Sequence, residues 1–242
     1  MLSAVDRKIA TEIVGHLEIP RDFGLDEYGG GFIFGEDDYI LYRLHSYFPD
    51  IQFELITGCS KAVIISDELP FVIKIPFNGV WYEKERYDEE SEPEYYFDYF
   101  HFNKNNEPTD YCEIELHNTI KAKVEGFREF FPDINYLGRF GDTRFYIQEK
   151  VQNIKMCPFK LSNDGLTWAR SIGADKDQWD YFICNEEWRA AVYDLYGKEK
   201  LFQLVDWAVF NKLEWLNDLH SGNYGFSMDG KPIILDVSGF FE

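Results

Sequence analysis

Three short apolar runs, separated by turn-like segments, most constrain what this chain can fold into. The runs cover residues 52–57, 62–66 and 71–76. Each is five or six residues long, a length that suits a strand better than a helix. The connecting segments, 58–61 and 67–70, contain Gly, Ser, Asp and Pro, which favour turns. Three consecutive strands with such short connections predict an antiparallel meander.

The first 50 residues predict an N-terminal extension that precedes this sheet. A helix is indicated by apolar residues that recur at helical spacing, which are Val5, Ile9, Ile13 and Leu17. Three glycines at 29–31 then break the chain. The apolar runs 32–34 and 39–42 flank a turn and read as two short strands, so we expect a helix followed by a hairpin.

Residues 83–110 are acidic and rich in tyrosine. One interpretation is a docking surface for a basic partner. The alternative is a solvated insertion anchored by its aromatic side chains, and we favour it because blocks of like charge are usually solvated. We therefore expect an insertion within the sheet-forming part of the chain, which we place at residues 51–151.

A helix and two more strands are predicted after this insertion. Residues 112–131 have helical periodicity. The face that we expect to be buried carries Leu116, Ile120, Val124 and Phe127. Residues 135–138 and 144–151 then read as strands.

Residues 152–242 are mainly helical in pattern. The strongest helical periodicity of the chain lies at 201–219. Two apolar runs, 224–226 and 233–235, flank an Asp229-Gly230 turn. Because Asp-Gly between apolar runs is a strong hairpin signal, we expect a hairpin there.

Composition excludes several classes of partner. The chain has 242 residues, of which 45% are apolar, so a sizeable core is expected. Its 24 basic and 44 acidic residues give a net charge of 24 − 44 = −20. This charge repels phosphate backbones and anionic lipid, so we expect no nucleic-acid partner and no membrane partner.

The sequence also predicts a cytoplasmic location. No apolar run reaches the roughly 18 residues of a membrane-spanning helix. The polar N-terminus lacks the apolar region of a signal peptide. The four cysteines are widely spaced, which argues against a zinc site and, in the cytoplasm, against disulfides.

The most informative residues for function lie in the last 25 of the chain. Asp218 follows an apolar helix, Asn223 begins the predicted hairpin, and Asp236 lies on its second strand. The hairpin should bring Asn223 and Asp236 side by side, with Asp218 nearby. This pattern suits phosphoryl transfer, because one carboxylate orients the acceptor while a carboxylate and an amide oxygen hold Mg²⁺ against the phosphates. Oxygen ligands match Mg²⁺.

The segment Asp218-Leu219-His220-Ser221-Gly222-Asn223 resembles the catalytic loop of the protein-kinase-like superfamily. The local match is closest to aminoglycoside and choline phosphotransferase-type kinases, whose loop reads His-Gly-Asp-Leu-His-x-x-Asn. The resemblance implies that Asp218 is the catalytic base and that Asn223 and Asp236 bind Mg²⁺. It also implies a two-lobed α+β fold, with an N-terminal antiparallel sheet plus a helix, and a reduced, mainly helical second lobe.

The same resemblance implies a lysine on the third strand that reaches the α- and β-phosphates of ATP. Lys74, in the middle of the run 71–76, fits this position. Its partner would be a glutamate of the following helix, and both Glu113 and Glu115 qualify. Glu113 is favoured because it shares the expected apolar face of that helix.

Two further regions complete the nucleotide site that the resemblance implies. Gly58 is the one glycine available for a phosphate loop, although an ordinary hairpin turn explains it equally well. Backbone amides and the hydroxyl of Ser60 are expected to contact phosphate. Residues 145–151 resemble the strand and hinge that receive adenine, with Glu149 and Val151 as candidates for the backbone hydrogen bonds.

Departures from the family pattern keep three functions open. Leu216 and Asn217 precede Asp218, so the usual histidine is missing. The glycine after Asp236 is displaced by one position, and the chain ends six residues after Asp236. We therefore expect the acceptor site, for a small molecule or a protein, to come from the N-terminal extension, the acidic insertion or residues 152–200. The three functions are an ATP- and Mg²⁺-dependent phosphotransferase, a nucleotide-binding pseudokinase that acts as a regulatory or interaction module, and an enzyme that transfers the nucleotide.

Overall fold

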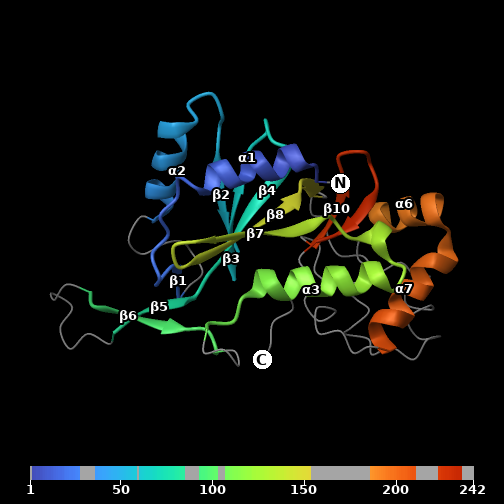
Figure 1. Ribbon diagram of the computed structural model, residues 1–242. Coiled ribbons are helices and arrows are strands. Elements are labelled where there is room, and N and C mark those ends of the chain that lie inside the picture. Colours follow the sequence, from blue (N-terminus) through green and yellow to red (C-terminus); the bar gives the residue numbers. More distant parts are fainter. Residues whose placement is uncertain are drawn as a thin grey trace. The chain divides into compact units, whose positions relative to one another are not determined.

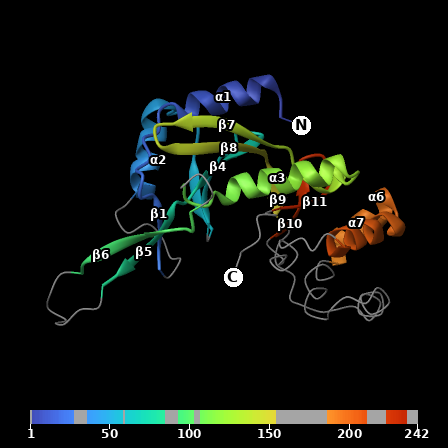
Figure 2. The ribbon, with the colours of Figure 1, turned by 60° about the horizontal axis from the view of Figure 1, so that its bottom comes forward.

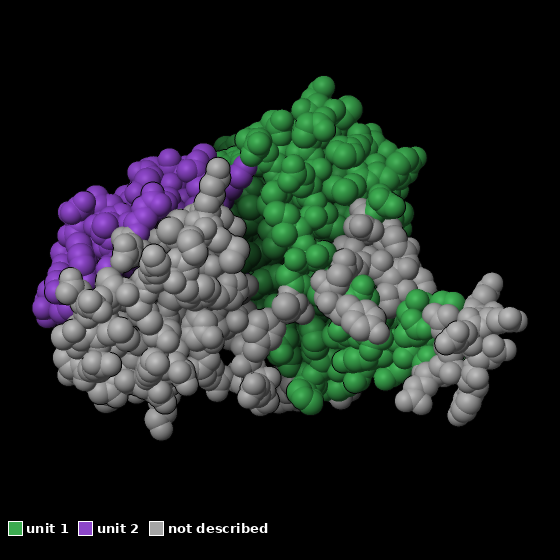
Figure 3. Space-filling model, turned by 180° about the vertical axis from the view of Figure 1, so that it is seen from behind, with its two compact units in different colours: residues 1–113, 134–148 green, residues 114–133, 149–242 purple. Residues whose placement is uncertain are grey.

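The computed structural model describes residues 2–27, 36–58, 60–84, 93–102, 107–153, 186–210 and 223–235 (Figure 1). These residues form a mixed α and β structure, which confirms the predicted α+β class. The chain divides into two compact units, coloured separately in Figure 3. The first comprises residues 1–113 and 134–148, and the second comprises residues 114–133 and 149–242. No helix in the described part of the chain is long and apolar enough to cross a membrane.

The first unit is built on a five-stranded sheet of order β2-β3-β4-β8-β7. Its strands are β2 (Glu54–Thr57), β3 (Lys61–Ile65), β4 (Phe71–Pro76), β7 (Ile134–Phe140) and β8 (Thr143–Glu149). β2, β3 and β4 pair in antiparallel fashion, and so do β7 and β8. The predicted meander is thereby confirmed. The strand predicted at 144–151 is divided between β8 and a separate strand, β9 (Val151–Asn153).

Two helices cover one face of this sheet (Figure 2). Their apolar side chains and those of the sheet form the core of the unit. The helices are α1 (Ala4–Val14) and α2 (Glu36–Tyr47). Fully or almost fully buried members of the core include Ile13, Leu44, Ile64, Ile73 and Ile147. The predicted extension, residues 1–50, therefore shares the core of the sheet and belongs to the same compact unit.

α1 confirms the predicted N-terminal helix and begins with a capping box. The Ser3 hydroxyl accepts a hydrogen bond from the Asp6 amide (3.1 Å), and the Asp6 carboxylate accepts one from the Ser3 amide (2.7 Å). Val5, one of the apolar residues noted at helical spacing, is exposed, whereas Ala10 and Val14 are buried.

α2 shows that the strand predicted at 39–42 is wrong, and the strand predicted at 32–34 lies outside the described residues. Ile40 and Leu44 are one helical turn apart, and both are buried in the core. Aromatic and β-branched residues favour a strand locally, but the burial of one helical face against the sheet decides the outcome.

The acidic segment 83–110 begins at the last residue of β5 and contains β6, and both strands belong to a second sheet. β1 (Gly24–Asp26) pairs in parallel with β5 (Gly79–Glu83), and β5 pairs in antiparallel fashion with β6 (Tyr95–Tyr99). Aromatic rings pack across the β5–β6 pair, as Trp81 and Phe97 do. These contacts agree with the aromatic anchoring expected for residues 83–110, although the strands begin earlier, at Gly79.

α3 (Tyr111–Val124) lies within the predicted helix 112–131 apart from its first residue, but it buries a different face from the one predicted. The residues buried along it are Cys112, Glu115, Thr119 and Ala122. Ile120 and Val124, which were expected in the core, are 48% and 80% exposed. Apolar periodicity failed here because the helix buries polar side chains, whose burial depends on partners that are distant in the sequence.

The second unit contains a small sheet of order β11-β10-β9 packed on a helix. Its other described elements are η1 (Arg128–Phe130), α6 (Glu186–Tyr196), α7 (Lys198–Phe210), β10 (Tyr224–Ser227) and β11 (Pro232–Ile234). The antiparallel β10–β11 pair confirms the predicted hairpin. Trp188 of α6 donates its ring N–H to the Ile233 carbonyl (3.1 Å) and packs on Tyr224. The helix predicted at 201–219 is confirmed as far as Phe210, and its remainder lies outside the described residues.

Replacing Gly79 with alanine is expected to destabilise the first unit. A Cβ atom at Gly79 would lie 2.0 Å from the Asp98 carbonyl oxygen on β6, so the main chain would have to move. We expect a loss of about 3 kcal/mol or more in the free energy of unfolding, measured by urea titration. Gly58→Ala is the matched control, because its Cβ would meet nothing nearer than the Lys61 carbonyl oxygen at 3.8 Å. Equal stability of the two variants would contradict the described β5–β6 pairing.

Candidate functional site

The face of the five-stranded sheet away from α1 and α2 carries several polar side chains that are buried. Ile64 on β3, Ile73 on β4 and Ile147 on β8 belong to the apolar core. Successive side chains of a strand point to opposite faces, so the residues between these positions lie on the other side of the sheet. We name this side the polar face. It carries Lys61, Lys74, Tyr146 and Gln148, none of which is more than 5% exposed.

Lys74 lies in the middle of the third strand of the meander, β4, as predicted. It is directly opposite Val63 of β3. Lys61 lies two residues before Val63, so the two lysines are diagonal neighbours on the polar face. Both lysines interact with other groups of the chain. The sequence prediction found Lys74 and missed Lys61. Lys61 could have been recognised because it lies on the adjacent strand, and alternate residues of the two paired strands share a face.

The turn before β3 contains the two residues predicted to contact phosphate. The Gly58 amide donates to the Lys61 carbonyl (2.9 Å), and the Ser60 carbonyl accepts from the Phe77 amide (3.0 Å). Ser60 therefore continues the β3–β4 pairing, and alternation places its side chain on the face of Ala62, in the apolar core. This placement gives no support to a contact between the Ser60 hydroxyl and phosphate. Gly58 does not require a glycine for its turn, since its φ is not positive and a Cβ would have room.

The strand end predicted to receive adenine has its backbone partly occupied. The Glu149 amide donates to the Asp133 carbonyl (2.8 Å), and Val151 lies in β9 opposite Ser227 of β10. Gln148, one residue before Glu149, was not predicted as a site residue. Its side-chain oxygen is buried and, within the described residues, has no hydrogen-bond partner. Such an acceptor is costly unless something satisfies it.

The two glutamates that were considered as partners of Lys74 have different surroundings in the structure. Glu113 pairs with Arg144 (3.1 Å) and its side chain is partly exposed. Glu115 is the buried glutamate of α3. The preference for Glu113 depended on the predicted apolar face of the helix, which the structure reverses, so that reason no longer holds.

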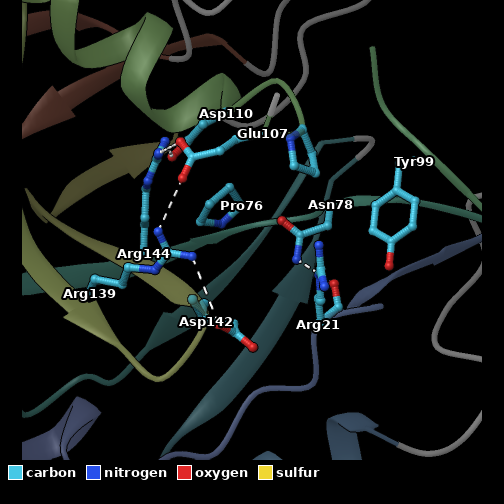
Figure 4. Close-up of a pocket in the computed structure, with 11 residues that line it drawn as sticks. Arg21, Pro76, Asn78, Tyr99, Glu107, Asp110, Arg139, Asp142 and Arg144 are labelled. Carbon is cyan, nitrogen blue, oxygen red and sulfur yellow. Dashed lines mark hydrogen bonds and ion pairs between the residues drawn. The ribbon is translucent and has the colours of Figure 1, made fainter. Parts of the chain in front are cut away.

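Arg144 on β8 is bound by carboxylates from the start of α3 and the segment before it (Figure 4). It forms ion pairs with Glu107, with Asp110 (3.4 Å) and with Glu113. Asp110 also accepts hydrogen bonds from the Tyr146 hydroxyl (2.6 Å) and from the Glu113 amide (3.0 Å). The second of these bonds caps the N-terminus of α3.

Burial sets the ionisation of this network. It raises the pKa of the Asp110 carboxyl, although the Tyr146 hydroxyl and the Glu113 amide oppose the rise. Burial and the neighbouring Asp110 also raise the pKa of the Tyr146 hydroxyl, which therefore stays a donor. In contrast, Arg144 lowers the pKa of Glu107.

The network lines a cavity of about 290 Å³ within the first unit. Arg21 and Asn78 lie across the cavity from Arg144, and the Asn78 side chain donates to the Arg21 carbonyl (2.8 Å) (Figure 4). Arg139 pairs with Glu107 (3.1 Å) and more distantly with Asp142. Arg139 and Arg144 both form ion pairs with carboxylates. We therefore infer that the network holds the start of α3 against β8.

The hairpin of the second unit brings Asn223, a predicted metal ligand, next to Leu235. Asn223, just before β10, is buried. Its carbonyl oxygen accepts a hydrogen bond from the amide of Leu235, just after β11 (2.7 Å). Asp236 is the next residue in the sequence, but Asp236 and Asp218 lie outside the described residues. Among the residues that are described, no group of three or more His, Cys, Asp or Glu side chains is arranged to hold a metal ion.

Comparison with protein-family models gives no match. Comparison with curated proteins finds no sequence of significant similarity. What this chain does is therefore inferred from the chemistry and placement of its own residues.

Replacing Tyr146 with phenylalanine tests the network. We expect a loss of about 1–2 kcal/mol in unfolding free energy at pH 7, because the buried Asp110 carboxylate loses a charge-assisted hydrogen bond. The loss should shrink as the pH falls through the pKa of Asp110, because this bond favours the charged form. Urea titrations at several pH values measure both effects. Tyr136→Phe is the control, since Tyr136 on the adjacent β7 is 47% exposed. A loss as large in the control would argue against the assigned role of Tyr146.

Proposed function

We propose that this chain is a kinase-like phosphotransferase that binds ATP and Mg²⁺. The observation that carries the proposal is Lys74, which is buried in the middle of the third strand on the polar face. A lysine at this position binds the α- and β-phosphates of ATP in protein kinases. Lysine is seldom buried in the middle of a strand, so the burial of Lys74 there supports a functional role over simple packing.

The order of elements supports a kinase-like, two-lobed fold. A meander that ends in the lysine-bearing strand, β4, is followed by α3 and by two further strands of the same sheet, β7 and β8. The hairpin β10–β11 comes later in the chain. Protein kinases carry their third-strand lysine, their helix glutamate and their metal-binding residues in this order. Such an analogy supports the fold, whereas the proposed activity depends on the site residues.

The ends of the hairpin support the proposed Mg²⁺ ligands. The hydrogen bond between Asn223 and Leu235 brings the first ligand next to the residue that precedes the second, Asp236. An amide oxygen and a carboxylate are hard ligands that fit Mg²⁺. Bound Mg²⁺ would neutralise the charge on the β- and γ-phosphates of ATP.

Two further residues fit roles in the proposed nucleotide site. Glu115 is a better candidate than Glu113 for the helix glutamate, because Glu115 is buried and Glu113 is engaged by Arg144. The side-chain oxygen of Gln148 is a buried acceptor at the strand end proposed to receive adenine. We propose that it accepts a hydrogen bond from the amino group of the base.

In the proposed reaction, a hydroxyl oxygen of the acceptor forms a bond to the γ-phosphorus. The bond from that phosphorus to the oxygen it shares with the β-phosphate breaks, and ADP leaves. Asp218 orients the hydroxyl and takes its proton. Lys74 holds the α- and β-phosphates in place. The acceptor is a small molecule or a protein side chain.

Asp236→Asn is expected to abolish the Mg²⁺-dependent part of ATP binding. In the unchanged chain, Mg²⁺ with ATP at 100 times its Kd should add about 2.7 kcal/mol to stability. This increase corresponds to a rise of roughly 5 °C or more in Tm, measured by thermal shift. Asp229→Asn is the matched control, because Asp229 lies in the turn at the other end of the hairpin. The proposal is wrong if the unchanged chain shows no shift with ATP and Mg²⁺.

Asp218→Ala separates catalysis from binding. We expect ATP hydrolysis without an acceptor to fall by about 10²-fold or more, since a general base is lost, while the thermal shift with ATP and Mg²⁺ is retained. Hydrolysis is measured by ADP release, and intact mass identifies any modified protein. Binding without hydrolysis in the unchanged chain would instead favour the pseudokinase, and AMP attached to protein would favour nucleotide transfer.

A further inference from the structure

We infer that Lys61 is a second phosphate-binding residue, so that the site marked by Lys74 takes a nucleoside di- or triphosphate in preference to a monophosphate. This inference rests on the proposed function and adds a ligand class and a residue to it. Nothing in the kinase resemblance assigned Lys61, which emerges from the pairing of β3 with β4.

The register of this pair places the two lysines on one face of the sheet. Lys61 is opposite Pro76, and Val63 is opposite Lys74. Residues directly opposite in an antiparallel pair share a face, and so do residues two apart on one strand. Lys61 and Lys74 are therefore diagonal neighbours, a relationship with a typical separation of about 7–8 Å between backbones. Lysine side chains extended from such positions can reach successive phosphates of one chain.

The burial of both lysines is unusual for this residue type. Lys61 is 4% exposed and Lys74 is 5% exposed. Two like charges side by side away from water repel each other and lose hydration, so anions must balance them. Each lysine interacts with other groups of the chain, and an arriving polyphosphate would add to those interactions or replace them. A chain with a net charge of −20 has a particular need for local cations where it binds a polyanion.

The neighbourhood of Lys61 suits a phosphate better than another anion. Lysine acts on phosphate as a point charge and needs no fixed planar geometry. A single carboxylate or a monophosphate would satisfy one ammonium group, whereas a di- or triphosphate can satisfy both.

Lys61→Met tests the inference through the affinities for ATP, ADP and AMP, measured by calorimetry with Mg²⁺ present. We expect the Kd for ATP to rise about tenfold or more, and the Kd for ADP to rise in the same direction. The Kd for AMP should change by less than about twofold, because AMP does not extend to the second lysine. Lys61→Arg, which keeps the charge, should retain most of the affinity for ATP. Lys84→Met is the matched control, since Lys84 is an exposed lysine of the same unit, paired with Glu94.

The outcomes distinguish the inference from the proposed function. If the unchanged chain binds none of the three nucleotides, the proposed function fails and the inference fails with it. If Lys74→Met weakens ATP binding while Lys61→Met binds ATP as the unchanged chain does, the inference alone is wrong. An equal loss for ATP and AMP in Lys61→Met would also overturn it, because the effect would then not depend on the extra phosphates. If Lys61→Met does not unfold cooperatively, Lys61→Gln replaces it, with the same expected changes in the Kd values for ATP, ADP and AMP.

Discussion

The burial of alternate side chains of β3, β4 and β8 against α1 and α2 is the constraint on which the rest of the first unit depends. Ile64, Ile73 and Ile147 fill this core. Because side chains alternate with a period of two, a slip of one residue in β4 would drive Lys74 into the core. The apolar packing thus fixes the register, and the register decides which residues face the other side. The polar face is a consequence of the core and needs no separate specification.

The sequence predicted the strands of the five-stranded sheet and the C-terminal hairpin, but not the sheet of β1, β5 and β6. The strands of the meander and the β10–β11 hairpin were found because short apolar runs and turn residues are local signals. α2 was missed because its aromatic and β-branched residues favour a strand, and only the core against which Ile40 packs decides for a helix. The buried face of α3 was missed because Glu115 and Thr119 are polar, and no local pattern says which polar groups will find partners.

For the candidate site, the sequence predicted those residues that occur at a recognisable spacing. Lys74 lies in the strand expected for it, and Asn223 lies directly before the first strand of the expected hairpin. Lys61 and Gln148 were missed because each becomes informative only through the register or burial of its strand. The network of Asp110, Arg144 and Tyr146 joins residues more than 30 positions apart, which a single sequence does not pair.

The close approach of β1 to β5 bears on how this chain tolerates change in length. Gly24 pairs with Gly79, and the Asn78 amide donates a hydrogen bond to the Phe23 carbonyl (2.8 Å). The arm formed by β5 and β6 is therefore hydrogen-bonded to a segment that lies between α1 and α2 in the sequence. Deletion of β5 and β6 would remove the strand with which β1 pairs. Natural insertions and deletions should therefore gather in the connection between β5 and β6, where a longer loop costs little entropy.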